Sequence, residues 1–202
     1  MAIFHASVRT ISRASGRSAT AAAAYRAGVT IHDTRDGLTH DYTRKGGVAG
    51  SVIVLPSGAA AAFADRSTLW NAAEAAEKRK DARVARELIL ALPHELDDEG
   101  RAATALAMAE WLAARYGVAV DVSRHNPDRQ GDQRNHHAHL LFTTRTVGAD
   151  GFGGKTKALD DWKQGPEEVQ AIRLAWEAIA NAALEKAGSS ARIDHRSHKE
   201  LG

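Results

Sequence analysis

The stretch V-A-V-D-V-S-R-H-N-P-D-R-Q-G-D-Q-R-N-H-H-A-H-L-L-F-T-T, residues 118–144, contains two strand-like segments separated by polar residues. In residues 118–125, Val118, Val120 and Val122 alternate with Asp121, Ser123 and His125, and residues 136–144 include the apolar run L-L-F. Alternation with a period of two predicts β-strands, and the polar turn over residues 126–134 is too short for a crossover helix. The two strands are therefore expected to be antiparallel neighbours in one sheet.

A short helix is expected upstream of this region. Ser18 is a residue type that caps helix N-termini, residues 19–27 are almost all alanine, and Gly28 supplies a stop. Residues 29–47 contain two turn signals, Asp-Gly and Gly-Gly, and predict a loop or a hairpin.

The remaining segments complete a mixed fold. Residues 148–154 are rich in glycine and predict a mobile loop. Further strands are expected at residues 2–11, 51–55, 83–92 and 192–197, and further helices at residues 67–80, 99–116 and 166–186. The predicted fold class is α+β, with a largely antiparallel five-stranded sheet flanked by helices.

Three histidines fall on one face of the two central strands. His137 and His139 share a face because strand side chains alternate, and a tight antiparallel return brings His125 beside them. Three imidazoles with open coordination positions form the ligand set of a catalytic metal site, whereas the alternative is three unrelated histidines. Asp121 shares this face, so it either orients a ligand imidazole or faces solvent.

The composition is that of a folded domain. The chain has 202 residues, 44% hydrophobic and 26% charged, so a single domain over residues 1–202 is expected. It has no cysteine, which leaves histidine and carboxylate as metal ligands. No apolar run is long enough for a membrane span or a signal peptide, which predicts a cytoplasmic protein without membrane insertion.

Positive charge is concentrated near the N-terminus. Residues 1–50 hold seven arginines and lysines against three aspartates, a net charge of +4, whereas the whole chain carries +2. This distribution favours an anionic partner such as nucleic acid, although a solvated basic surface explains the charge equally well.

Tyr25 is the one large uncharged side chain on the alanine helix. A tyrosine in that setting is usually a packing residue, but small neighbours leave space around Tyr25 and Arg26 adjoins it. A phenol has a pKa of about 10 and is a poor nucleophile at neutral pH. A nearby metal ion that polarises a phosphate would make that phosphate easier for the tyrosine to attack.

The sequence resembles the MobA/MobL (MobQ-type) plasmid mobilisation relaxases of the HUH endonuclease superfamily. The resemblance covers nearly the whole chain, in the order of the family. It rests on M-A-I-F-H at residues 1–5, G-R-S-A-T-A-A-A-A-Y-R-A-G at 16–28, H-D-Y-T-R-K-G-G at 40–47, L-W-N-A-A-E-A-A-E-K-R-K-D at 69–81, A-R-E-L-I-L-A-L-P-H-E-L at 85–96, N-H-H-A-H-L-L-F-T-T-R at 135–145 and I-D-H-R-S at 193–197.

The resemblance assigns roles to individual residues. It implies that Tyr25 is the nucleophile and that His125, His137 and His139 bind a divalent metal, Mn²⁺ or Mg²⁺, with Zn²⁺ as an alternative. It places Glu87 as an acid that assists the site, by orienting a metal-binding histidine or by acting on Tyr25.

Two further residues, Tyr42 and His136, bear on this assignment. Tyr42 is a rival nucleophile, in the basic segment D-Y-T-R-K. His136 stands where the family often has proline, and we expect it to point away from the metal.

The implied activity is nicking of one DNA strand at a plasmid transfer origin, through a 5′-phosphotyrosine adduct that can be religated. The implied partners are origin DNA, as a single strand with adjacent duplex, together with accessory relaxosome proteins and a coupling protein. Such a domain is expected to be the N-terminal part of a longer bacterial protein. The candidate DNA-binding residues are Arg17, Arg26, Arg44, Lys45, Lys155 and Lys157.

Two other functions also fit these residues. One is a non-catalytic DNA-binding module whose histidines hold a structural metal. The other is a replication-initiator or transposase nuclease of the same superfamily.

Overall fold

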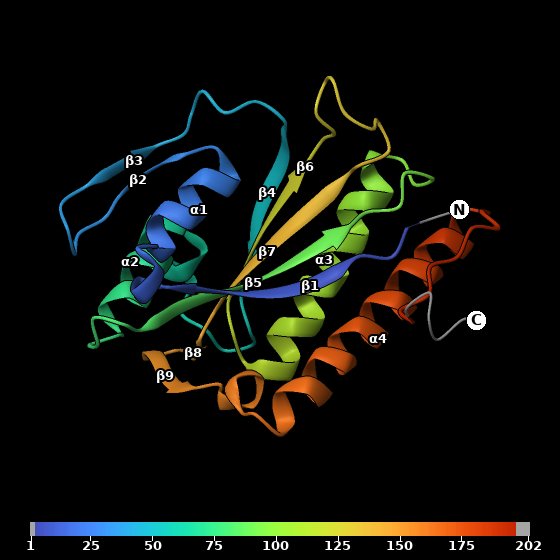
Figure 1. Ribbon diagram of the computed structural model, residues 1–202. Helices are drawn as coiled ribbons and strands as arrows, with labels where there is room; N and C mark the ends of the chain where they lie inside the picture. Colours follow the sequence, from blue (N-terminus) through green and yellow to red (C-terminus); the bar gives the residue numbers. More distant parts are fainter. Residues whose placement is uncertain (1–2, 197–202) are drawn as a thin grey trace.

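Five antiparallel strands form the central sheet in the computed structural model, which describes residues 3–196 (Figure 1). Their order is β1-β5-β7-β6-β4, and each neighbouring pair is antiparallel. The predicted pairing of the two central strands and the predicted fold class are thus confirmed. The strands are β1 (Ala6–Ser12), β4 (Val48–Val54), β5 (Arg83–Ala91), β6 (Val120–His125) and β7 (His137–Thr143).

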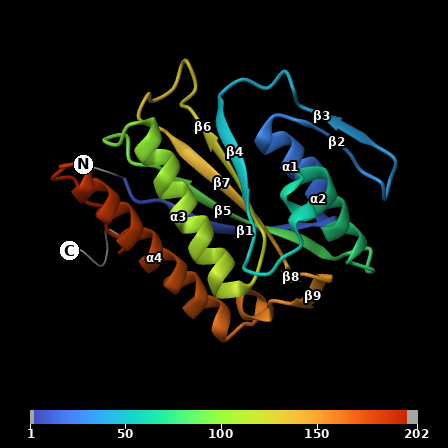
Figure 2. The same ribbon diagram turned by 180° about the vertical axis from the view of Figure 1, so that it is seen from behind.

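Two pairs of helices lie on opposite faces of this sheet (Figures 1 and 2). Leu88, Val120 and Leu140 point toward α3 and α4 and form the larger core with Trp176. The other face carries a smaller core beneath α1 and α2, so only part of it is covered. The helices are α1 (Ala19–Ala27), α2 (Arg66–Ala75), α3 (Asp98–Tyr116) and α4 (Gln164–Lys186), with short 3-10 turns η1 (Arg13–Ser15), η2 (Ala61–Ala64) and η3 (Lys157–Asp160).

Helix α1 has the predicted limits. The Ser18 side chain accepts a hydrogen bond from the Ala21 amide at the N-terminus, and Gly28 adopts a left-handed φ of 65° at the C-terminus. Helix α2 ends earlier than predicted. Its carbonyl at Glu74 and the later one at Glu77 accept hydrogen bonds from the Arg13 guanidinium, which holds the chain as it turns toward β5.

The hairpin interpretation of residues 29–47 is confirmed by a two-stranded ribbon of β2 (Thr30–His32) and β3 (Thr39–Asp41). The glycine-rich segment also forms a ribbon, β8 (Arg145–Gly148) with β9 (Gly151–Lys155), rather than the predicted loop. Gly151, with a φ of 107°, makes the tight turn between these strands.

The strand predicted at residues 192–197 is wrong for residues 192–196, and Ser197 lies outside the described residues. The Asn181 side chain of α4 binds both the amide and the carbonyl of Ile193. These backbone groups are therefore satisfied by a helix side chain and need no neighbouring strand. Within residues 3–196, no helix combines the length and apolarity required to cross a membrane.

Candidate active site

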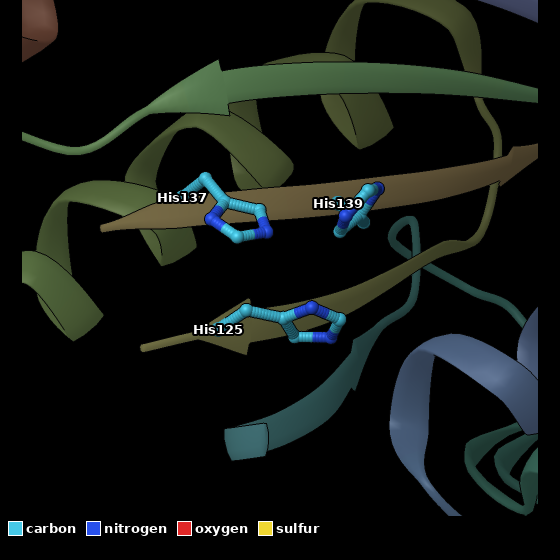
Figure 3. Close-up of side chains that lie close together, drawn as sticks. All are labelled: His125, His137 and His139. Atoms are coloured by element: carbon cyan, nitrogen blue, oxygen red, sulfur yellow. The ribbon is translucent and has the colours of Figure 1, made fainter. Parts of the chain in front are cut away.

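His125, His137 and His139 meet on the open part of the sheet face that α1 and α2 partly cover (Figure 3). His125 of β6 pairs directly with His137 of β7, and His139 lies opposite Ser123. The three ring centroids are 4.9 to 5.3 Å apart. One nitrogen from each ring lies within 4.8 Å of the others, which is close enough for the three to share one cation.

Each imidazole is also held through its second nitrogen. His139 Nδ1 lies 2.6 Å from Glu87 Oε1, and His137 Nδ1 lies 3.1 Å from the Asn135 carbonyl oxygen. His125 Nε2 lies 2.7 Å from the Arg26 carbonyl oxygen. Such contacts fix the ring and its tautomer, and they leave the other nitrogen of each histidine available to a metal.

The surroundings favour the neutral form that binds metals. Burial lowers the pKa of His125 to about 4, despite its bond to the Arg26 carbonyl, and burial also lowers the pKa of His137. Neutral imidazoles need not lose a proton before they coordinate a cation. The donor set and its outer contacts therefore fit a divalent metal with open coordination positions.

Glu87 connects this cluster to α1. Its carboxylate is 2% exposed, and it binds His139 on one side and the Arg26 guanidinium on the other. Burial raises the pKa of Glu87, but hydrogen bonds from Arg26 and His139 outweigh it and hold that pKa at about 2. Of the two roles considered for Glu87, its contacts support orientation of a candidate metal ligand.

We expect Glu87→Gln to flatten the pH dependence of folding stability in acid. Because the folded pKa of about 2 lies below the ordinary 4.5, the ionised carboxylate stabilises the fold above pH 4.5, and this contribution is lost as the pH falls from 4.5 to 2. About two thirds of this contribution, on the order of 2 kcal/mol, is lost between pH 7 and pH 3. Urea unfolding at pH 7 and at pH 3 measures it; equal pH dependence in both proteins would contradict it.

The Arg26 side chain, predicted as a DNA contact, is held by Glu87 and by its own helix. Its Nη2 donates to Glu87 Oε2 at 2.8 Å and its Nη1 to the Ala22 carbonyl at 3.1 Å. Because its carbonyl also accepts from His125, Arg26 ties α1 to two of the three histidines. The neighbouring Tyr25 is thereby placed beside the cluster.

Tyr25 is 49% exposed and lies between two residues of the loop after β3. The Tyr42 ring meets it edge-on, with centroids 5.2 Å apart. The Lys45 ammonium lies 3.9 Å from the Tyr25 ring centroid and donates to the Tyr25 carbonyl at 3.0 Å. Lys45, predicted as a phosphate contact, is thus directed toward the candidate nucleophile, where a phosphate approaching Tyr25 would meet its charge.

Asp121 is not a partner of the histidines, and it does not face solvent. Its carboxylate is 2% exposed, accepts two hydrogen bonds from Arg66 at 2.8 and 2.9 Å, and accepts one from Trp70 Nε1 at 2.9 Å. Strand alternation places Asp121 on the correct face, but α2 covers that end of the sheet and supplies these partners.

The predicted basic residues separate into two groups. Arg17 and Arg44 are exposed on the side of the molecule that carries Tyr25. Lys155 pairs with Glu77 at 2.9 Å, and Lys157 begins η3, beyond the end of β7 opposite the histidines (Figure 1). The last two therefore lie away from the candidate site.

A basic cavity borders Tyr25, with a volume of about 860 Å³. Five of its basic residues are not among the predicted DNA contacts, although the pairing of β1 with β5 places one of them, Arg9, beside Glu87. Arg17, Tyr25 and Glu87 are among its other lining residues. The basic residues around it are Arg9, Arg13, Arg17, Arg26, Arg35, Lys78 and Lys80.

A family model described as the MobA/MobL family matches residues 17–202. Mobilization protein MobL of Acidithiobacillus ferridurans is 46% identical over all of this chain and 60% of its own length. Probable mobilization protein MobA of Bifidobacterium longum is 33% identical over all of this chain and 42% of its own length. The chain thus spans less than two thirds of these relatives.

Solved structures have the same fold. One, from work on the molecular basis of vancomycin resistance transfer in Staphylococcus aureus, is 33% identical with a TM-score of 0.86 and covers 98% of this chain and 100% of its own. The metal-bound conjugative relaxase TrwC in complex with oriT DNA is 13% identical with a TM-score of 0.54 and covers 91% of this chain and 71% of its own.

Proposed function

Because the chain belongs to the MobA/MobL family, we propose that it is a relaxase domain that nicks one DNA strand at a plasmid transfer origin through Tyr25. The observation that carries this proposal is the link from the Tyr25 helix to the histidine cluster. Arg26 binds Glu87 through its side chain and His125 through its carbonyl, so the candidate nucleophile and the candidate metal ligands form one unit.

The reaction is a transesterification. A divalent metal held by His125, His137 and His139 would polarise the scissile phosphate and offset its growing negative charge. The Tyr25 oxygen attacks phosphorus and loses its proton to solvent, while the bond to the 3′ oxygen breaks and that oxygen takes up a proton. Lys45, whose ammonium lies over the Tyr25 ring, would supply a further positive charge to a phosphate that approaches this residue.

The product is a 5′-phosphotyrosine, and the 3′-hydroxyl can attack it to restore the strand. This reversal needs no other energy source because the phosphodiester bond energy is kept in the adduct. One tyrosine suffices for a nick and its religation.

The substrate assignment draws on the relatives and on charge. The names of the relatives concern mobilization, and TrwC was solved with oriT DNA. Here the basic cavity beside Tyr25 is the proposed path of the single-stranded backbone, with Arg44 as a further phosphate contact. Mn²⁺ or Mg²⁺ is the proposed metal, and accessory relaxosome proteins and a coupling protein are proposed as further partners.

Incubation with labelled single strands from the native plasmid origin tests this function. A covalent adduct that survives denaturation and forms only with Mn²⁺ or Mg²⁺ is expected. DNA binding without any adduct, with all metals and origin strands, would indicate a non-catalytic DNA-binding module instead.

We expect Arg17→Ala to weaken binding of origin and scrambled single strands alike, because phosphate contacts carry no base information. The plot of log affinity against log salt should become shallower by about 0.7, the value for one lost single-strand contact. Fluorescence anisotropy at several salt concentrations measures the slope. Lys157→Ala is the matched control and should leave it unchanged; a shift for Lys157 alone would place the DNA at the other end of the sheet.

A further inference from the structure

A second cavity, of about 510 Å³, adjoins the histidine cluster on the side of His137. Its lining includes His5, which directly precedes β1, Ala91 at the end of β5 and the residues that lead into β7. The volume falls within the range of small-ligand sites, and it exceeds what one nucleobase needs.

The two cavities lie in succession along the same strands. Arg9 and Glu87, which pair with each other, line the basic cavity. His5 and Ala91, joined by a backbone hydrogen bond of 3.2 Å, line the second cavity four residues further along. Four strand residues span about 13 Å.

The histidine cluster lies between these two positions. On β7, His139 pairs with Ile89 and His137 pairs with Ala91, so the row of candidate ligands begins just beyond Glu87 and ends at the wall of the second cavity. A strand whose scissile phosphate sits on the cluster would therefore have one cavity on each side of that phosphate.

The chemistry of the second cavity differs from that of the basic one. Arg134, the one arginine or lysine among its lining residues, is paired with Asp132 at 2.8 Å. The walls combine imidazole rings, apolar side chains and the polar side chain of Asn135. The imidazoles are His5, His94, His136 and His137, and the apolar residues include Ile89, Leu92 and Pro93.

Such a lining suits a nucleobase better than a phosphate. Flat aromatic side chains stack on bases, and polar groups beside them bind the base edges. A charge-compensated wall offers little attraction to a backbone phosphate. Because His137 lines the second cavity, a base bound there would belong to a nucleotide next to the scissile phosphate and not to a distant one.

The direction of attack decides which nucleotide this is. In phosphoryl transfer the attacking and leaving oxygens lie roughly in line on opposite sides of phosphorus. Tyr25 lines the basic cavity, so the leaving 3′ oxygen is directed away from it, toward the second cavity. We propose that the second cavity binds the base of the nucleotide immediately 5′ of the nick, the one that carries the leaving 3′-hydroxyl.

This inference rests on the proposed function and deepens it. Holding that base would select the nucleotide at the cleavage position. It would also retain the free 3′ end beside the phosphotyrosine, so that religation can follow.

Equilibrium binding in the Tyr25→Phe background tests the assignment without cleavage, once the nick has been mapped with the wild-type protein. The probes are fluorescent origin strands, either intact or with an abasic site 5′ or 3′ of the nick. Loss of the 5′ base should weaken binding by about tenfold. In His94→Ala and His5→Ala, intact strands should bind more weakly than to the parent. The 5′ abasic site should cause little further loss of affinity in these variants, because the imidazole on which the base would stack is already absent.

His32→Ala is the matched control, an exposed histidine on the β2 ribbon, and it should keep the full penalty for the 5′ abasic site. An unchanged Mn²⁺ affinity shows that the cavity variants are folded. Equal abasic penalties in His94→Ala, His5→Ala and the parent, or a larger penalty for the 3′ abasic site, would overturn the assignment. If the wild-type protein forms an adduct but the cavity variants keep the full penalty for the 5′ abasic site, only the cavity assignment fails. If no origin strand yields an adduct, the proposed function fails.

Discussion

Tyr25→Phe is expected to abolish formation of the covalent DNA adduct, with a loss of at least about 10³-fold, while DNA affinity stays within about twofold of wild type. The substitution removes the oxygen that forms the bond to phosphorus, but it removes no charge and keeps the ring. The contacts with Tyr42 and Lys45 are made by that ring and by the backbone carbonyl, so the loop after β3 should keep its position.

Denaturing gel electrophoresis of labelled strands measures the adduct, and fluorescence anisotropy measures affinity. Tyr42→Phe is the matched control, since it makes the same chemical change 5.2 Å away, measured between ring centroids, and it should retain adduct formation. An adduct in Tyr25→Phe that is lost in Tyr42→Phe would transfer the nucleophile role to Tyr42.

The sheet and the histidine cluster were predictable because their signals are local. Alternation along residues 118–125 sets which side chains share a face, and the short connection to β7 fixes an antiparallel pairing. These two facts place His125 on the face of His137 and His139, beside them, without any knowledge of the helices. Helix α1 was equally predictable, since Ser18 and Gly28 mark its ends.

The partners of the site residues were not predictable, because they come from distant parts of the chain. Asp121 meets Arg66 across 55 positions, and Arg26 meets Glu87 across 61. Strand parity tells which face Asp121 occupies, but not that α2 covers that end of the face. The packing of α2 therefore overturns the expectation that Asp121 faces solvent or orients a ligand. Phosphate binding by Arg26, which pairs with Glu87 and lines the basic cavity, stays a prediction.

The two lysines near the glycine-rich segment lie away from the candidate site for a related reason. A loop at residues 148–154 would have left Lys155 and Lys157 free to reach a ligand, whereas the β8–β9 ribbon fixes Lys155 against Glu77. The glycine content indicated a loop, but composition did not reveal that the residues on either side of the turn pair as strands.

If the three histidines bind one metal ion, variants around the site should differ in Mn²⁺ affinity in a fixed order. His137→Ala and His139→Ala each remove a ring whose free nitrogen faces the shared centre, so each should lower Mn²⁺ affinity by more than about 100-fold. Glu87→Gln keeps all three ligands but weakens the contact that orients His139, for which a loss of about 10- to 100-fold is expected.

His136→Ala is the matched control in this series, because it deletes the adjacent imidazole in the same H-H-A-H segment. His136 lines the second cavity and is not among the three grouped histidines, so the Mn²⁺ affinity of this variant should stay within about threefold of wild type. Calorimetric titration with Mn²⁺ gives all four values without DNA, and nicking of origin strands should fall in the same order. Equal losses for His136, His137 and His139 would mean that β7 presents its residues in another register, which would also remove His137 from the wall between the metal site and the second cavity.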